Sequence, residues 1–530
     1  MTSAFDTIAR GALGPEQFVT LGTLTLLATS GLCMRSWLLV HVSRKRALAG
    51  GVAYVLAPYH LYDIYARGAL AEASAYASVP LIMLALARLS DGRRGALPLL
   101  SVAYAAVLFS HLPTALLVSL FLIAPYVTFL AATSVRPLRF IASSLTGGLV
   151  GIGLAAIYLV PALTLLTYVS ARALSGGFYR PDNWFFWHIR AGLMSARMYL
   201  IVPVTLAAFA LAAQSVRAAR GSAAHRSALF WASLTIFLTV IIAGVVPGVW
   251  HLPGLKLVQF PWRALLLVEF TTITMLTLHF PRLKSPMALC AAALLAFAYC
   301  VLALMIGHTT ARTQKRQEQT AAEIRAGYLD APEYLPAGTK IVQGAGPDDL
   351  WIQLPQLPLA HADSPAAEVR VSEADDGAMT IKVVSPSPTR LVLRRFYFPH
   401  WRAEGADGRP VALSPDPRDK VVTFRVPAGY STIRLFHGAA PHQDQASLAS
   451  LLALLAVAIM AVLARLRPRP PYRPRGGHQS HRVKLSPFAA LSSSSCEKLK
   501  SGFIRSSWRF KPSTILPRPT LSAQYIGPPR

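Results

Sequence analysis

The sequence predicts an α-helical polytopic membrane protein, with about eleven transmembrane helices and one small extracytoplasmic antiparallel β-sandwich domain. Three observations predict this fold. Hydrophobic residues make up 53% of the 530 residues and charged residues only 14%, whereas a soluble domain carries about 25% charged residues. Apolar runs recur along the chain, and basic residues follow every second run. The stretch before the last run alternates apolar and polar residues, as short strands do.

The membrane helices are predicted from the apolar runs, because a helix needs about 20 mostly apolar residues to cross the hydrocarbon core. The second run is short, so a half-helix and a tilted, packed helix both remain open for it. The fourth and fifth runs are divided by Ser110-His111-Leu112-Pro113. The runs lie near 17–39, 46–58, 73–89, 95–110, 113–132, 140–168, 197–213, 227–247, 262–280, 286–306 and 446–465.

The charges of the loops predict the orientation of the chain. Basic residues of membrane proteins gather on the cytoplasmic side. Here they follow the first, third, fifth, seventh, ninth and eleventh runs, beginning with Arg44-Lys45-Arg46. The other loops and the stretch 307–445 are then extracytoplasmic. We expect the tryptophans near these outer ends to form an interfacial aromatic belt: Trp184, Trp187, Trp250 and Trp262.

The chain divides into four parts. Residues 1–306 form a multi-span membrane domain, and residues 446–465 form the final transmembrane helix. Between them, 307–445 begins with a polar helical linker and changes at about residue 340 to a β-sandwich. Asp407-Gly408 is typical of a hairpin turn. The clearest strand patterns are 380–384, 390–393, 421–426 and 432–436.

The fourth part, 466–530, is predicted to be a disordered basic cytoplasmic tail, because it shows no apolar periodicity. Residues 465–530 hold fourteen Lys and Arg against one acidic residue, Glu497. The whole chain has a net charge of +28. Its basic residues lie in the tail and in short loops rather than in one stripe. This distribution argues against nucleic acid as a partner and favours the bacterial inner membrane.

Ionisable residues at the outer ends of the runs are the first candidates for function, because placing them there costs free energy. If the segment after residue 58 is helical, Asp63 and Arg67 are neighbours on one face, and Glu72 begins the next span. Asp63 and Glu72 are candidates for a catalytic base or for binding the acceptor, and Arg67 for binding a phosphate. An interfacial segment whose charges only pair with one another is equally open.

Three further residues are candidates. His111, at the break between two runs, is a candidate base or a structural hydrogen-bonding residue. Arg263 suits a phosphate head group, because a guanidinium binds two oxygens; otherwise it anchors a span at the interface. Arg180 is a candidate for phosphate or lipid binding in a segment predicted to be an amphipathic surface helix. No metal-ligand, nucleotide-binding or hydrolase motif occurs, and close helix packing is predicted at Gly147, Gly148 and Gly151.

Several motifs resemble those of bacterial membrane proteins named 6-pyruvoyl-tetrahydropterin synthase-related. Their signature is similar to the run Leu56-Ala57-Pro58-Tyr59-His60-Leu61-Tyr62-Asp63-Ile64-Tyr65-Ala66-Arg67-Gly68-Ala69-Leu70-Ala71-Glu72. The resemblance covers about residues 17–465 and leaves out the basic tail. The later landmarks, in order, are Ser110-His111-Leu112-Pro113-Thr114, Phe260-Pro261-Trp262-Arg263, Glu333-Tyr334-Leu335-Pro336 and Phe396-Tyr397-Phe398-Pro399-His400-Trp401-Arg402.

That family is grouped with the GT-C glycosyltransferases. The resemblance therefore implies a GT-C-like fold and transfer of a sugar from a polyprenyl-phosphate donor to a cell-envelope glycan at the outer face. It implies no pterin chemistry, because the histidine cluster of a pterin synthase is missing. GT-C proteins carry a catalytic acid in the first outer loop, and only Asp6 and Glu16 precede the first run here. We expect a glycosyltransferase or an inactive relative that lacks its N-terminal span.

Two other classes of function stay open. A transporter or flippase of lipid-linked material would show inverted repeats and helices broken at mid-membrane, and no internal repeat is visible in the sequence. A non-catalytic envelope scaffold would use the β-domain as its binding module. The lipid bilayer is a partner in each case. Formation of a new glycosidic bond would distinguish the enzyme from both, while the sequence predicts no cofactor and leaves the metal requirement open.

Overall fold

The computed structural model describes residues 14–466, apart from 171–179, 188–192, 220–224, 280–284, 326–327, 330–334, 340–341, 344–349, 354–357 and 375–376. The predicted disordered tail, from residue 467, and residues 1–13 lie outside the described residues.

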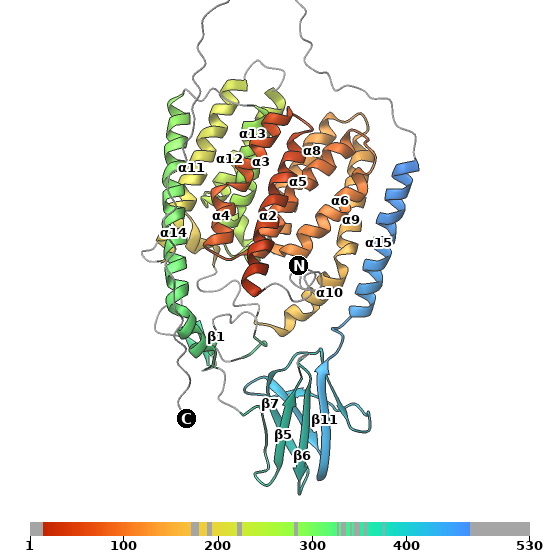
Figure 1. The fold of residues 1–530 in the computed structure, drawn as a ribbon. Helices are drawn as coiled ribbons and strands as arrows, with labels where there is room; N and C mark the ends of the chain where they lie inside the picture. Colours follow the sequence, from red (N-terminus) through yellow and green to blue (C-terminus); the bar gives the residue numbers. More distant parts are fainter. Residues whose placement is uncertain are drawn as a thin grey trace, which may run out of the picture. The chain divides into compact units, whose positions relative to one another are not determined.

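Helices form most of the described chain up to residue 325 (Figure 1). Each predicted apolar run is largely helical, and the polar linker after 307 continues the preceding helix rather than starting a new one. The α-helices are α2 (Pro15–Leu38), α3 (Arg44–Val55), α4 (Pro58–Tyr65), α5 (Leu70–Ser90), α6 (Ala96–Ser110), α7 (Leu112–Val118), α8 (Ala124–Thr133), α9 (Pro137–Leu154), α10 (Ala156–Thr164), α11 (Leu193–Ala219), α12 (His225–Ile242), α13 (Leu265–Leu278), α14 (Pro286–Arg325) and α15 (Gln443–Leu466).

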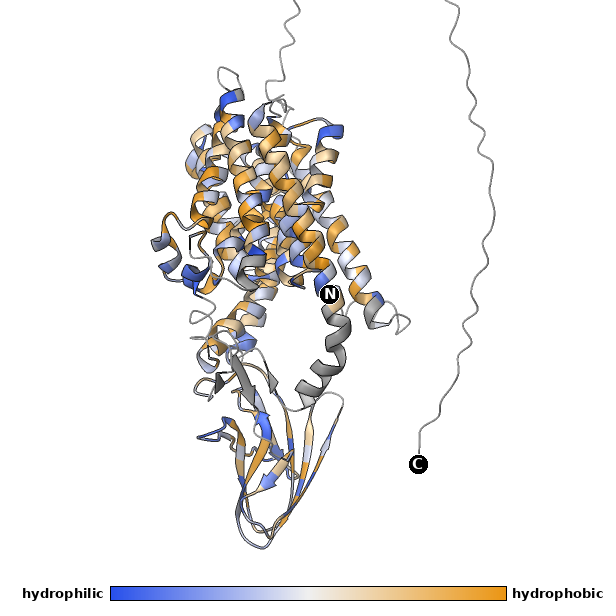
Figure 2. Cartoon of the chain, turned by 90° about the vertical axis from the view of Figure 1, so that its left-hand side faces the viewer, coloured by the Kyte–Doolittle hydropathy of each residue, from blue (hydrophilic) through white to orange (hydrophobic). Residues whose placement is uncertain are grey.

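The chain is a multi-pass membrane protein. Seven helical segments of the described chain are long and apolar enough to cross a bilayer: Gln17–Leu38, Leu70–Ser90, Leu112–Thr133, Pro137–Leu154, Arg197–Arg217, Pro286–Ala311 and Gln443–Leu466. Figure 2 shows hydrophobic residues along most of the length of the helices. Three more apolar helices are only 10–17 residues long. The total of about eleven spans therefore stays a prediction.

The helices pack around one apolar core. Helix α2 packs against α5, α5 against α6, and α6 against α9 (Figure 1). The core also takes in the aromatic residues expected at the membrane interface. Trp184, Trp250 and Trp262 are buried, while Trp187 is exposed. The predicted aromatic belt is therefore wrong for these three residues, because their rings pack on neighbouring aromatic and aliphatic groups: the Trp184 and Trp262 ring centroids lie 6.0 Å apart.

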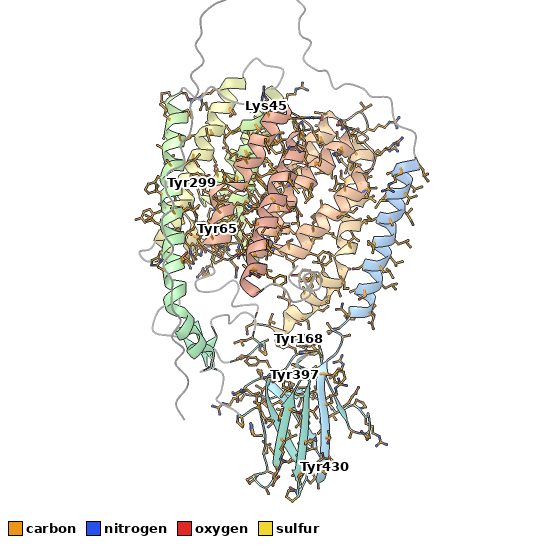
Figure 3. The ribbon with its side chains drawn as sticks, in the orientation of Figure 1. Lys45, Tyr65, Tyr168, Tyr299, Tyr397 and Tyr430 are labelled. Carbon is orange, nitrogen blue, oxygen red and sulfur yellow. The ribbon has the colours of Figure 1, made fainter. Side chains whose placement is uncertain are left out.

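The strands after residue 359 form two four-stranded antiparallel sheets, ordered β4-β7-β10-β9 and β5-β6-β11-β8. Inward side chains of both sheets share one apolar core, which includes Ile381, Leu391, Phe424 and Leu435. The two sheets therefore form the small sandwich that the alternating runs predict, with Tyr397 and Tyr430 near its opposite ends (Figure 3). The strands are β4 (Ala360–Ala362), β5 (Glu368–Glu373), β6 (Met379–Ser385), β7 (Thr389–Phe396), β8 (Trp401–Gly405), β9 (Ser414–Pro415), β10 (Val421–Val426) and β11 (Gly429–His437).

The predicted hairpin turn follows β8. Gly408 has a φ of 74°, which a glycine adopts without steric cost. The Gly408 N–H donates to the Gly405 carbonyl at 3.0 Å, and the Gly405 N–H donates to the Arg409 carbonyl at 2.9 Å. A separate small sheet, β1-β3-β2, joins Tyr328–Leu329, Leu350–Gln353 and Val342–Gln343.

Close helix packing is confirmed at two of the three predicted glycines of α9. A Cβ on Gly151 would lie 2.8 Å from the Ser101 carbonyl oxygen of α6, and one on Gly147 would lie 2.6 Å from the Leu100 side chain. A Cβ on Gly148 would meet no described atom within 4 Å. Helix α9 therefore meets a side chain of α6 at Gly147 and the backbone of α6 at Gly151.

Gly151→Ala should lower the free energy of unfolding by about 1–3 kcal/mol, because a backbone carbonyl cannot move aside for the new methyl group. Gly148→Ala, on the same helix, should be neutral or stabilising by at most about 1 kcal/mol, since alanine is the better helix former. Thermal unfolding in detergent, followed by circular dichroism, measures both. Equal effects of the two substitutions would show that α6 and α9 do not touch at Gly151.

Candidate functional site

The corner between α4 and α5 brings three of the predicted residues together. Pro58 stands at the first position of α4, where proline needs no hydrogen-bond partner for its nitrogen. Gly68 has a φ of 65°, which ends the helix and turns the chain into α5. Asp63 and Arg67 form the expected i,i+4 ion pair, and Glu72 lies in the first turn of α5. The spacing of the sequence thus predicted this contact correctly.

Glu72 is the centre of the cluster. Its Oε1 accepts a hydrogen bond from the Tyr59 hydroxyl at 2.5 Å, and its Oε2 accepts one from Arg67 Nη1 at 3.0 Å. Arg263 Nε lies 3.4 Å from the same Oε2. Glu72 and Asp63 are each only 1% exposed, so their carboxyl groups have almost no contact with solvent. We refer to Asp63, Arg67, Glu72 and Arg263 as the charge cluster. By formal charge its two carboxyl groups balance its two guanidiniums, and burial, together with the charge of Glu72, raises the pKa of Asp63.

Arg263 reaches the charge cluster from a distant part of the sequence. It lies in a short 3₁₀ helix, Pro261–Ala264, which leads directly into α13. Its Nη1 donates to the Val258 carbonyl at 2.8 Å and to Gln259 Oε1 at 3.1 Å. The Arg67 guanidinium carbon lies 4.6 Å from the Trp262 ring centroid, a cation–π contact. Trp262 therefore packs against the charge cluster and is not exposed at the membrane interface as a predicted belt residue would be.

Some polar atoms beside the charge cluster are buried without a partner. Among the described residues, no hydrogen bond is made by Asp63 Oδ2, the Tyr62 hydroxyl or Trp262 Nε1. Leaving a buried polar atom unpaired costs about 1–3 kcal/mol, so such groups call for an explanation. The unpaired atoms are a carboxylate oxygen, a phenol hydroxyl and an indole N–H, and they lie within or beside the charge cluster.

His111 adjoins the charge cluster. It lies between the two helices, directly after the last residue of α6 and directly before the first residue of α7, and its Nδ1 lies 2.8 Å from the Thr114 hydroxyl. Burial lowers the pKa of His111 from 6.5 to about 4; the charge of Glu72 opposes this shift, and the charges of Arg263 and Arg67 add to it. The imidazole is therefore neutral near pH 7.

The protein should lose stability on acidification because of His111. Its folded pKa lies below its unfolded pKa, so between about pH 6.5 and pH 4 the unfolded chain binds more protons and stability rises with pH. The loss between pH 7.5 and pH 5 should be about 2 kcal/mol. Unfolding of the wild type and of His111→Gln at both pH values isolates this contribution. Equal pH slopes for the two proteins would contradict it.

Arg180 lies elsewhere. It is exposed, and its Nη2 is 3.7 Å from Asp182 Oδ2. The segment around it is a short 3₁₀ helix, Pro181–Trp184, with Trp184 and Phe185 buried. The predicted amphipathic surface helix is therefore wrong for this part of the segment, because its aromatic residues enter the protein core. The described contacts place Arg180 beside Asp182 and not in the charge cluster.

Glu269 is a buried carboxylate that sequence reasoning missed. It lies on α13, and its Oε1 accepts the Tyr59 backbone N–H at 2.6 Å. Its Oε2 accepts the Tyr76 hydroxyl at 3.2 Å. Glu269 thereby satisfies a free N–H in the first turn of α4 and connects α13 with α4 and α5. An acidic residue inside an apolar run is a signal that would have found it.

The arrangement suits acid–base and anion-binding chemistry. Two guanidiniums can neutralise a phosphate, and an unpaired carboxylate oxygen can accept a proton. Within the described ranges, no three His, Cys, Asp or Glu side chains are grouped so that they could hold a metal ion. No protein-family model matches the chain, and no curated protein or solved structure matches it.

Proposed function

We propose that this membrane protein transfers a sugar from a polyprenyl-phosphate donor to a hydroxyl acceptor of the cell envelope, as a GT-C-like glycosyltransferase. One observation carries the proposal. Two buried guanidiniums flank Glu72, and a carboxylate oxygen of Asp63 beside them has no partner among the described residues. Anion-binding groups and a free proton acceptor, side by side, are what this transfer requires.

Arg67 and Arg263 are proposed to bind the phosphate of the donor. Both side chains are largely buried, 14% and 11% exposed, so their charges are weakly screened by solvent. A guanidinium can offer two N–H groups to two phosphate oxygens. As the bond to the sugar breaks, negative charge grows on the leaving phosphate, and the arginines stabilise it.

Asp63 is proposed to act as the base. The acceptor O–H gives its proton to Asp63 Oδ2 while the acceptor oxygen bonds to the anomeric carbon of the sugar. The bond between that carbon and the phosphate oxygen breaks, and its electron pair leaves with the polyprenyl phosphate. Glu72 holds both arginines in place, and neutral His111 can hydrogen-bond the acceptor. Arg180 remains a proposed lipid contact outside this chemistry.

The proposed topology follows the charges of the loops. The site and residues 307–445 face the outside of the inner membrane, and the tail from 466 faces the cytoplasm. The polyprenyl chain would lie in the bilayer beside the spans, and the sandwich would face an envelope glycan. The charge cluster joins residues near the outer ends of predicted spans, which agrees with a substrate presented at that surface.

The test is transfer in proteoliposomes that contain the purified protein, a radiolabelled polyprenyl-phosphate sugar and envelope glycan acceptors. We expect labelled glycan with the wild type. Arg263→Ala should lower the rate at least about 100-fold, as loss of one charge-stabilising group does in other enzymes. Arg139→Ala, which removes an exposed arginine of a predicted cytoplasmic loop, is the matched control and should retain the wild-type rate.

The outcomes separate the classes of function. Movement of the lipid between leaflets without a new glycosidic bond would indicate that the protein is a flippase and not a glycosyltransferase. Binding of glycan without either activity would indicate a scaffold or an inactive relative. Transfer that is unchanged in Arg263→Ala would overturn the assignment of the phosphate site.

A further inference from the structure

The turn that precedes Arg263 has an unusual backbone. Gln259 has a φ of 67° and a ψ of −54°, and the Phe260 N–H donates to the Val258 carbonyl at 2.8 Å. A hydrogen bond across one residue with these angles defines the rare γ-turn whose central residue has a positive φ. This conformation is strained for any residue with a side chain.

Gln259 differs from the other residues of this kind. Three non-glycine residues of the described chain have a positive φ: Gln259, Lys420 and His442. Of these, only Gln259 is buried, at 7% exposed. A buried, strained turn persists only where its surroundings impose it, and such turns cluster at functional sites.

The turn provides both acceptors that hold Arg263. The Val258 carbonyl, which closes the turn, also accepts from Arg263 Nη1 at 2.8 Å, and Gln259 Oε1 accepts from the same nitrogen at 3.1 Å. The Phe260 ring lies under the guanidinium, 5.0 Å from its central carbon. With Nη1 anchored in this way, Nε lies toward Glu72 and the rest of the charge cluster.

We propose that Gln259 is a positioning residue, whose strained turn sets the direction of the Arg263 guanidinium. This inference rests on the proposed function for its effect on catalysis, but the Gln259–Arg263 coupling itself does not. A glycine at 259 would adopt the same φ without strain and would lack the amide that holds Arg263. The turn is thus predicted to reduce stability while it serves the site.

The test compares Gln259→Gly with Lys420→Gly, which relieves a positive φ of 56° within the sandwich. Relief of the strained φ opposes the larger backbone entropy that glycine brings to the unfolded chain, so both variants should unfold near the wild-type temperature. Gln259→Gly should lower kcat for sugar transfer at least 10-fold, whereas Lys420→Gly should leave it unchanged. If Gln259→Gly is both clearly less stable and less active than the wild type, Gln259 has only a structural role. If its kcat equals that of the wild type, Gln259 has no role in catalysis. Either result overturns the inference.

A second measurement does not need turnover. The shifts in unfolding temperature of Gln259→Gly, Arg263→Ala and the double variant form a cycle. If Gln259 holds Arg263, the two shifts are not additive, whether or not the protein transfers sugar. Additive shifts would overturn the positioning role. If the wild-type protein transfers no sugar but the unfolding-temperature shifts are not additive, the proposed function is overturned. The positioning of Arg263 by Gln259 then still stands.

Discussion

Replacing Asp63 with asparagine should lower kcat for sugar transfer by about 10²–10⁴-fold, the usual contribution of a positioned general base. Asparagine has the shape of aspartate, but it cannot take a proton from the acceptor hydroxyl. The fold should survive the change, because Arg67 keeps its hydrogen bond to Glu72 at 3.0 Å. We therefore expect KM for the donor to change little while kcat falls.

The assay is the proteoliposome transfer of labelled sugar, measured over a range of donor concentrations. Asp182→Asn provides the control, since it removes a carboxylate that pairs with Arg180 outside the charge cluster. A kcat of Asp63→Asn within threefold of the wild type would remove Asp63 from the reaction. A large rise in KM at constant kcat would make it a binding residue instead.

Glu72→Ala should lower the free energy of unfolding by about 3–5 kcal/mol, as removal of one partner of a buried ion pair does. Its carboxylate accepts from the Tyr59 hydroxyl and from Arg67, and it is the near partner of Arg263 Nε. Without it, three buried groups lose their acceptor or counter-charge at once. Denaturation of the purified protein in mild detergent measures the loss.

The control for Glu72 is an exposed ion pair of the sandwich. Glu373 Oε1 lies 2.5 Å from Arg395 Nη2, but the two side chains are 40% and 29% exposed. Glu373→Ala should therefore change stability by no more than about 1 kcal/mol. Similar losses for Glu72→Ala and Glu373→Ala would mean that solvent screens the charge cluster as it screens the protein surface.

Local spacing predicted part of the site from the sequence. Asp63 and Arg67 are one helical turn apart, so any helix over that segment brings them together. The contact of Arg263 with Glu72 depends on the packing of segments far apart in the chain, which no local pattern contains. For this reason Arg263 was found as an isolated candidate, and its strained turn at Gln259 was not predicted at all.

The apolar composition of the runs predicted where the helices lie. It did not predict whether a given side chain packs against protein or against lipid. A tryptophan near the end of an apolar run has the same sequence pattern at a lipid interface and in a protein core. Trp184, Trp250 and Trp262 lie in the core, because other segments pack over them. In the sandwich, the long alternating strands β6, β7, β10 and β11 were predicted, whereas the short edge strands β4 and β9 were too brief to show a period.

The charge cluster has a consequence for how the chain is made. Asp63, Arg67 and Glu72 leave the ribosome together with a net charge of −1, and the balancing Arg263 follows only after most of the helical part is synthesised. At about 5–20 residues per second this delay is roughly 10–40 s. During that time the segment formed by α4 and α5 carries one carboxylate more than it has cations, in or beside lipid. We therefore expect the early helices to need the insertion machinery until the later ones arrive, and chains truncated before Arg263 to be degraded.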